Sequence, residues 1–168
     1  MPNLGPGVPQ NLNPAVTPTW VFTPTPGVNT SFRISNNGGN TVYIGGANVS
    51  QYNGIPLAPG CRPVELQNCP FTVYTCSGVS LTGATKVSSA TAITAGSTGF
   101  TLTTSGQAVG PAVLGNGTSL EVVNISVSST TVVTLSSPTL YDHGISSTLA
   151  TATALPTNVT VTAGMGWH

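Results

Sequence analysis

The residues that could carry out acid–base chemistry are few and lie far apart in the sequence. There are three carboxylates and two histidines, and the closest pair is Asp142 and His143. Adjacent residues of a strand point to opposite faces, so these two side chains are not expected to act together. A hydrolytic site also needs a nucleophile beside its base, and the nucleophile-elbow motif G-x-S-x-G is missing from the sequence. We therefore predict no catalytic residue and no enzymatic activity, and interpret His143 as a loop residue that hydrogen-bonds its own turn.

The cysteines offer a second kind of chemistry, either metal binding or a disulfide. Cys61, Cys69 and Cys76 are the three cysteines of the chain, and their spacing fits no zinc template. No histidine lies near them to complete a metal site, and no glycine-rich loop leads into a helix to hold a phosphate, so the sequence predicts no metal site and no cofactor site. Two alternatives remain for the thiols. One pair could form a disulfide after release into an oxidising medium, or the thiols could be small buried side chains, which we favour.

The scarcity of charge limits the partners that the chain can bind. Charged residues make up 4% of the 168 residues and the formal net charge is zero, whereas about 25% of the residues in an average soluble domain are charged. Three dispersed cations cannot form the basic patch that nucleic acids or anionic membranes require. A neutral surface also favours association over repulsion. We therefore predict no nucleic-acid and no membrane partner, and a protein that packs against copies of itself or against another protein.

The N-terminal segment is expected to differ from the rest of the chain. Residues 1–27 contain seven prolines. A proline lacks a backbone donor and has a fixed φ, which excludes a helix or a central strand. We interpret residues 1–27 as an extended, proline-rich arm in which Trp20, Val21 and Phe22 form an apolar plug. This plug is a candidate contact with a partner, since the arm could either pack on its own domain or reach a neighbouring molecule.

From residue 28 onwards, short runs of alternating apolar and polar residues are separated by glycine and asparagine. Such alternation is typical of half-buried strands joined by tight turns. It predicts a first β module over residues 28–78 and a second over residues 99–168. Residues 79–98 consist mainly of serine, threonine, alanine and glycine, and we interpret them as a linker. The expected fold class is therefore all-β, with two small β-sandwich or barrel-like modules and an extended Pro-rich N-terminal arm.

Two stretches resemble β modules of bacteriophage virion proteins. The first reads NTVYIGGANV over residues 40–49, NGIPLAPG over residues 53–60 and FTVY over residues 71–74. The second comprises TGFTL at residues 98–102, NGTSLEVV at residues 116–123 and VTLSSPTLYDH at residues 133–143, where the resemblance implies that residues 141–143 close a hairpin. In the first stretch the resemblance implies that the turns of the module are formed by Gly45, Gly46, Gly54, Pro56, Pro59 and Gly60.

The resemblance, together with the low charge, implies a structural protein of a phage virion. The first hypothesis is a capsid decoration (minor capsid) protein that binds the outer surface of the major capsid protein lattice and stabilises it. The resemblance further suggests a homo-oligomer, with a trimer favoured. The second hypothesis is a head-fibre or tail-tip module that binds host glycans through exposed aromatic residues. The N-terminus lacks the basic and apolar regions of a signal peptide, so we expect synthesis in the host cytoplasm and assembly on the capsid exterior.

Overall fold

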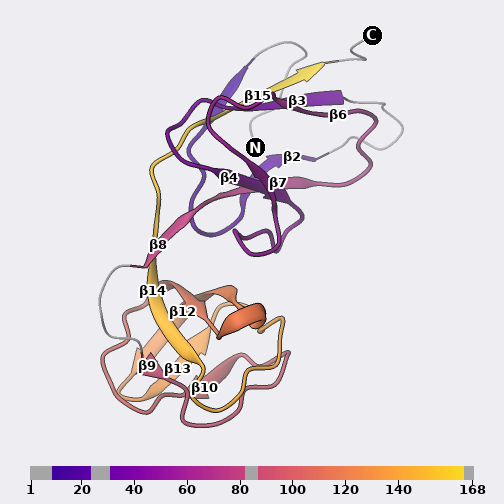
Figure 1. Ribbon diagram of the computed structural model, residues 1–168. Helices are drawn as coiled ribbons and strands as arrows, with labels where there is room; N and C mark the ends of the chain where they lie inside the picture. The colour runs from indigo at the N-terminus through magenta and orange to yellow at the C-terminus, as the bar shows by residue number, and fades with distance from the viewer. Residues whose placement is uncertain (1–8, 24–30, 82–86, 165–168) are drawn as a thin grey trace. The chain divides into compact units, whose positions relative to one another are not determined.

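The structure is all-β, which confirms the predicted fold class. The computed structural model describes residues 9–23, 31–81 and 87–164. Within these ranges it contains fifteen strands and one short 3₁₀ helix, η1 (Gly117–Ser119), but no α-helix (Figure 1). The strands form three antiparallel sheets. The alternating runs of the sequence therefore correspond to paired strands, as their period of two predicts.

The chain divides into two compact units, and one of them is inserted into the sequence of the other. Unit 1 consists of residues 1–78 and 154–168, and unit 2 consists of residues 79–153. The sequence pattern predicted a single module over residues 99–168. In the structure the C-terminal part belongs to unit 1, because β15 (Val159–Gly164) pairs along its whole length with β3 (Ser31–Asn36).

Unit 1 is a β-sandwich of two four-stranded antiparallel sheets. The first sheet has the strand order β1-β15-β3-β6, and the second sheet has the order β2-β7-β4-β5. The remaining strands of the unit are β1 (Gln10–Leu12), β2 (Thr19–Phe22), β4 (Val42–Gly45), β5 (Ile55–Leu57), β6 (Val64–Leu66) and β7 (Val73–Ser77).

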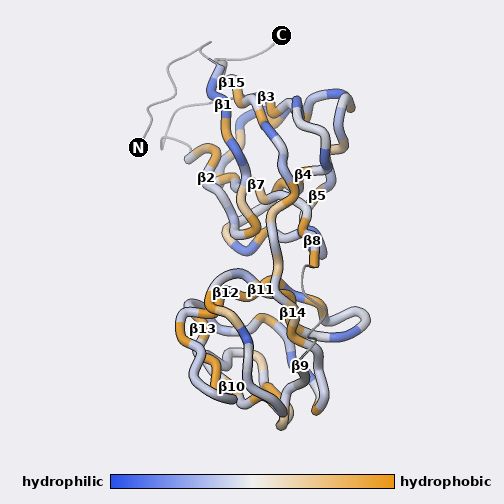
Figure 2. The backbone as a smooth tube through the Cα atoms, turned by 90° about the vertical axis from the view of Figure 1, so that its left-hand side faces the viewer, coloured by the Kyte–Doolittle hydropathy of each residue, from blue (hydrophilic) through white to orange (hydrophobic). Residues whose placement is uncertain are grey.

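The core of unit 1 is formed by the inward-facing residues of both sheets. Phe32 and Ile34 of the first sheet cluster with Val42 and Val73 of the second sheet, and all four are fully buried. The ring of Phe22 lies 4.8 Å from the ring of Phe32, centroid to centroid. Burying one such side chain stabilises a fold by about 1.5–3 kcal/mol. In Figure 2 the apolar segments, coloured orange, recur along the strands of both units.

The described part of the predicted arm, residues 9–23, belongs to unit 1. β1 and β2 are edge strands of the first and second sheets, positions at which neighbouring prolines remove no ladder hydrogen bond. Val21 and Phe22 are buried in the core, with exposed fractions of 1% and 7%, so they are unavailable to a partner. Trp20 is half-buried, and its indole N–H donates to Thr23 Oγ1 at 2.7 Å. This is the alternative in which the segment packs on its own domain; residues 1–8 and 24–27 lie outside the described residues.

Unit 2 is a small, barrel-like sheet. Its strand order is β10-β13-β12-β11-β14-β8, and β9 pairs with β14. A bridge between Ser89 and Leu102, together with a hydrogen bond from Ala90 N to Thr101 O at 2.8 Å, joins the segment after β9 to the end of β10. The strands are β8 (Val79–Leu81), β9 (Val87–Ser88), β10 (Gly99–Thr101), β11 (Gly110–Leu114), β12 (Glu121–Ser129), β13 (Val132–Leu135) and β14 (Thr148–Ala154).

The predicted linker, residues 79–98, is part of unit 2 wherever the structure describes it. It contributes β8 and β9 to the sheet, and Ile93 is buried in the core of the unit together with Phe100 and Leu114. The linker prediction was wrong here because a strand can be held by backbone hydrogen bonds without alternating side chains. Residues 82–86 lie outside the described residues.

The insertion of unit 2 predicts that unit 1 folds without it. Gly78 N donates to Thr41 O at 3.2 Å and Leu155 N donates to Gly78 O at 2.9 Å, so the two ends that unit 2 would leave are hydrogen-bonded neighbours within unit 1. We expect a chain with residues 79–153 replaced by a short glycine–serine turn to unfold cooperatively, as followed by circular dichroism. Removing residues 154–168 from this same variant should abolish its transition, because β15 is the central partner of β1 and β3. If the variant that lacks residues 79–153 unfolded without a cooperative transition, that result would contradict the division of the chain into units 1 and 2.

Candidate functional site

Three of the glycines that the resemblance assigns to turns, Gly45, Gly46 and Gly54, lie around one loop of unit 1, between β4 and β5. Gly45 ends β4, and the carbonyl of Gly46 accepts a hydrogen bond from Val49 N at 3.0 Å. At Gly54 an added Cβ would lie 2.7 Å from both Tyr43 Cβ and Val49 Cγ2. A larger residue at position 54 would therefore push this loop away from β4.

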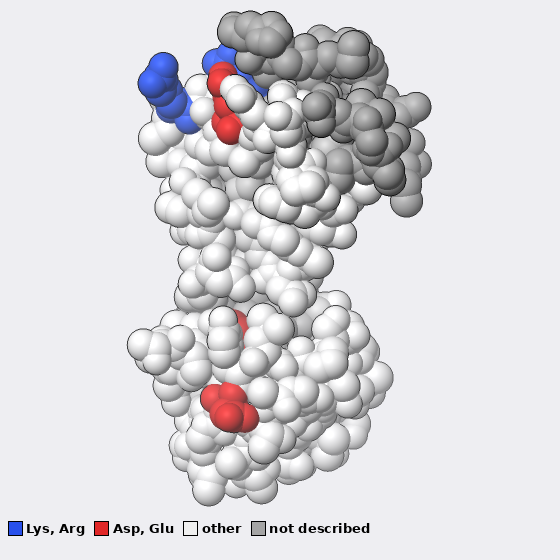
Figure 3. Space-filling model, turned by 90° about the vertical axis from the view of Figure 1, so that its right-hand side faces the viewer, with Lys and Arg blue, Asp and Glu red and all other residues white. Residues whose placement is uncertain are grey.

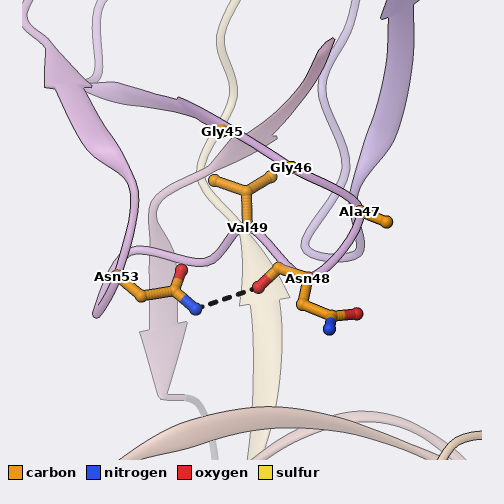
Figure 4. Close-up of a pocket in the computed structure, with 6 residues that line it drawn as sticks. All are labelled: Gly45, Gly46, Ala47, Asn48, Val49 and Asn53. Atoms are coloured by element: carbon orange, nitrogen blue, oxygen red, sulfur yellow. Dashed lines mark hydrogen bonds between the residues drawn. The ribbon is translucent and has the colours of Figure 1, made fainter. Parts of the chain in front are cut away.

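A surface hollow lies beside the same loop (Figure 4). It is lined by Gly45, Gly46, Ala47, Asn48, Val49 and Asn53. The Nδ2 of Asn53 donates to Asn48 O at 3.0 Å, and its Oδ1 accepts a hydrogen bond from Ser50 N at 2.7 Å. The lining of the hollow thus contains no titratable side chain, and the Asn53 amide is used to hold the loop.

The two prolines that follow in the sequence, Pro56 and Pro59, have different roles. Pro56 lies inside β5, opposite Tyr43, and not in a turn as the resemblance implied. β5 is an edge strand, where a missing N–H is tolerated. Pro59 and Gly60 do form a turn, in which Cys61 N donates to Ala58 O at 3.3 Å and Gly60 has a φ of +68°. Proline followed by a glycine with positive φ is the pattern of a type II turn.

The structure brings together two titratable groups that the sequence analysis did not pair. The Nε2 of His143 lies 2.6 Å from Oε1 of Glu121, the first residue of β12. The carboxylate also accepts hydrogen bonds from Leu140 N at 2.8 Å and from Tyr141 N at 3.4 Å. Glu121 and His143 are 3% and 2% exposed. Buried polar groups in folded proteins are hydrogen-bonded, and the carboxyl group of Glu121 meets this requirement through these contacts.

The imidazole of His143 is enclosed and has one free nitrogen. Its Nδ1 is buried without a hydrogen-bond partner. Gly115, with a φ of +113°, leaves room for the ring, because an added Cβ would lie 3.0 Å from Nδ1. Neither ring nitrogen therefore reaches solvent. The geometry lets the Glu121–His143 pair hold backbone in place, and it gives a substrate no access to the imidazole.

Hydrogen bonds from several elements hold residues 139–143, which we call the clamped segment. On one side the segment is bound to Glu121. On its other side His143 and Ile93 form a two-hydrogen-bond bridge, with N–O distances of 2.7 and 2.8 Å. Asp142 Oδ1 accepts a hydrogen bond from Ala95 N at 2.7 Å. The interpretation of His143 as bonding its own turn is thus corrected, since its partners come from β12 and from residue 93.

A signal for this pair was present in the sequence. Glu121, Val123 and Ile125 alternate along one strand, and alternation places all three on the same face. Val123 and Ile125 are core residues, so the carboxylate of Glu121 must also point inwards and must find hydrogen-bond donors. The identity of those donors could not be predicted, because they are brought in from a distant loop.

The cysteines form no disulfide, and two of the three are buried. Cys69 and Cys76 are buried and Cys61 is exposed. Cys69 Sγ donates to Phe71 O at 3.3 Å. Burial raises the pKa of the Cys76 thiol from 9.0 to about 12. The favoured alternative, buried thiols, therefore holds for Cys69 and Cys76 but not for Cys61.

The exposure of the thiols predicts selective modification. Near neutral pH we expect a thiol reagent to react rapidly with Cys61 alone, and with the other two only on unfolding. Between pH 9.0 and about 12 the unfolded chain releases the Cys76 proton that the folded chain retains, so the stability contributed by this group is lost as pH rises. Titration of native C61S with the reagent is the check. A rapidly reacting thiol in that variant would contradict the assignment.

Charged groups are sparse over the described surface. Arg33 and Glu65 face each other across β3 and β6, with their side-chain atoms 3.9 Å apart and both side chains about half exposed. Figure 3 shows one face of the molecule, on which uncharged residues, in white, cover most of the described surface. Among the described residues no cluster of three or more His, Cys, Asp or Glu could hold a metal ion. A search of the same residues for a helix that could cross a membrane finds none.

Comparison with known proteins gives no match to this chain. No family model matches its sequence, and neither a curated protein nor a solved structure is found to be similar to it.

Proposed function

We propose that this chain is a structural protein of a phage virion, most specifically a decoration protein that binds the outer surface of the major capsid protein lattice and stabilises it. The observation that carries the proposal is the nearly uncharged surface. In the described part of unit 2 the charged residues are Glu121 and Asp142, and Glu121 is buried. Protein interfaces are depleted of charged residues at their cores, so a neutral surface suits a protein that is covered by others.

Exposed apolar side chains on the same unit support the proposal. Isolated exposed apolar residues are normal on a soluble protein, but here almost no charge lies between them. Such a surface favours association, and the proposal includes self-association of the chain, with a trimer favoured. In the described part of unit 2 the exposed large apolar residues are Leu81, Val109, Val127, Val132, Leu140, Tyr141 and Ile145.

A non-enzymatic role is part of the proposal. General acid–base catalysis needs a titratable group within reach of its substrate. The histidine and carboxylate that lie closest together, His143 and Glu121, are buried and are used to hold a loop.

A second candidate function is a head-fibre or tail-tip module that binds host glycans. The observation in its favour is an aromatic pair on the second sheet of unit 1. Trp20 of β2 and Tyr74 of β7 are register partners, both are half-buried, and neither belongs to the core cluster. Neighbouring aromatic rings of this kind can supply an apolar surface with polar edges.

The amount of the protein in purified virions tests the proposal and separates the two functions. A decoration protein is expected in stoichiometric proportion to the major capsid protein on a quantified gel of particles of the encoding phage. A fibre or tail module would be present only in the small number of copies that a fibre or tail carries. Absence of the chain from the particles would contradict both.

A further inference from the structure

We propose that Asn116 is a site of spontaneous covalent modification, at which the backbone nitrogen of Gly117 displaces the side-chain amide as ammonia. An asparagine that precedes glycine is the most open to this reaction, because glycine has no Cβ to hinder the approach of its nitrogen. The structure holds two such pairs in place and leaves the third free to react, and the inference does not depend on the proposed function. The Asn-Gly pairs of the sequence are Asn37-Gly38, Asn53-Gly54 and Asn116-Gly117.

The reaction is a cyclisation followed by a hydrolysis. The Gly117 nitrogen gives up its proton and forms a bond to Asn116 Cγ, the Cγ–Nδ2 bond breaks, and Nδ2 leaves with that proton as ammonia. Water then opens the cyclic imide at either of its carbonyl carbons. One opening gives aspartate, and the other gives isoaspartate, in which the main chain runs through the side chain. Both products carry a carboxyl group that is ionised near neutral pH.

Asn53 is held against this reaction at both reacting groups. Its Nδ2 donates to Asn48 O at 3.0 Å (Figure 4), and its Oδ1 accepts a hydrogen bond from Ser50 N at 2.7 Å. The attacking atom, Gly54 N, donates to Ser50 O at 2.8 Å. These hydrogen bonds must break before the nitrogen can reach Cγ, which raises the barrier to cyclisation.

Asn37 is held in a similar way. Its Nδ2 donates to Thr160 Oγ1 at 2.5 Å, and Gly38 N donates to Asn36 Oδ1 at 3.0 Å. Gly38 is also closely packed, since an added Cβ would collide with Thr157 Oγ1. The peptide between residues 37 and 38 therefore has little room to rotate.

The backbone at Asn116 has no comparable restraint on the attacking atom. Asn116 and Gly117 are both exposed, and Gly117 N has no hydrogen-bond partner among the described residues. An added Cβ at Gly117 would meet nothing within 4 Å. Asn116 is extended, with a ψ of 146°, so the peptide must rotate before Gly117 N can reach Cγ. The open surroundings of Gly117 leave room for this rotation.

The contacts that hold the Asn116 side chain and carbonyl are weak. Nδ2 donates to Ser146 O at 3.4 Å, beyond the usual range of such bonds. Oδ1 lies 3.0 Å from Thr148 Oγ1, but this hydroxyl is also 2.9 Å from Gly115 O. A hydroxyl has one proton to donate, so Asn116 shares it. The Asn116 carbonyl accepts from Ser119 N at 3.4 Å and from Ser119 Oγ at 3.2 Å.

The modification alters the charge of unit 2. In its described part the exposed charged residue is Asp142, and the formal net charge of the whole chain is zero. A carboxylate at position 116 adds one negative charge to this surface. It also places an oxygen where Nδ2 now donates to Ser146 O, so that contact becomes repulsive. We therefore expect the modified chain to elute later than the unmodified chain from an anion-exchange column.

Incubation of the purified full chain in mildly alkaline buffer tests the inference, with one sample folded and one unfolded in guanidinium chloride. Trypsin cleaves after lysine and arginine but not before proline. It therefore separates residues 34–86, which contain Asn37 and Asn53, from residues 87–168, which contain Asn116. Mass spectrometry of the two fragments follows the exchange of amide for carboxyl.

In the folded chain we expect residues 87–168 to be converted at least about tenfold faster than residues 34–86, because more hydrogen bonds must break at Asn37 and Asn53. In the unfolded chain all three sites should react at similar rates. The variant N116Q keeps an amide but lengthens its side chain, which disfavours the cyclisation, so its residues 87–168 should stay unmodified. The matched control N53Q should leave the conversion of residues 87–168 unchanged.

Four results would overturn the inference. The first is equal conversion of the two fragments in the folded chain. The second is conversion of residues 87–168 that persists in N116Q. The third is a folded chain in which Asn116 stays unchanged while the unfolded chain reacts at all three sites. The fourth is a product that contains aspartate without isoaspartate, because direct hydrolysis by water would give aspartate alone.

Discussion

Replacement of Glu121 by alanine is expected to lower the free energy of unfolding of unit 2 by about 3–5 kcal/mol, because three hydrogen-bond contacts lose their shared partner. The change removes the acceptor of two backbone amides and leaves the Nε2 of His143 buried without a partner. Each unsatisfied buried group is unfavourable by about 1–3 kcal/mol. Thermal unfolding followed by calorimetry measures the total effect.

Glu65 provides the matched control for this change. Its carboxylate lies 3.9 Å from the Arg33 guanidinium, and both side chains are about half exposed. Exposed pairs contribute about 0–1 kcal/mol, so E65A should leave the unfolding transition almost unchanged. Hydrogen exchange adds a local readout, because the amides of Leu140 and Tyr141 should lose protection in E121A before the rest of unit 2 does. Equal stability of E121A and E65A would contradict the clamping role.

Replacement of Phe22 by alanine should destabilise unit 1 by about 3–5 kcal/mol, as buried phenylalanine-to-alanine changes do. Phe22 is 7% exposed and its ring lies 4.8 Å from that of Phe32. Truncation would leave a cavity between the two sheets. The indole of Trp20, two positions away on the same strand, is a local fluorescence reporter of urea unfolding.

Phe71 is the control, because it is 60% exposed. The variant F71A should change the free energy of unfolding by no more than about 0.5 kcal/mol. The comparison tests whether residues 19–22 belong to the fold or to an arm that waits for a partner. If residues 19–22 were such an arm, F22A would unfold like the unchanged chain, and that result would contradict their place in the core.

The strands of this protein could be predicted from sequence, but their partners could not. Alternation along residues 31–36 and 121–125 indicates strands because a period of two places every second side chain on one face. The same alternation at Val159 and Val161 indicates a strand but does not say that it returns to β3, more than 120 residues earlier. Pairing over such a distance depends on competition among all the strand edges that the chain offers. A local sequence pattern carries no information about that competition.

For the N-terminal segment the sequence left two alternatives open, and the described residues 9–23 take the one in which the segment packs on its own domain. Prolines exclude a central strand, and the edge positions of β1 and β2 agree with that limit. They do not exclude an edge strand that buries Val21 and Phe22. The candidate site shows the same limit on what the sequence predicts. The inward face of Glu121 follows from its strand, whereas its donors, Leu140 and Tyr141, come from a loop that only the folded chain brings near.

The most direct test of the proposed function is a cryo-electron microscopy reconstruction of virions of the encoding phage, compared with virions from which the gene has been deleted. The account predicts difference density on the outer surface of the shell, repeated with the lattice and large enough for units 1 and 2. Difference density confined to a fibre or the tail, or identical shells with and without the gene, would contradict it.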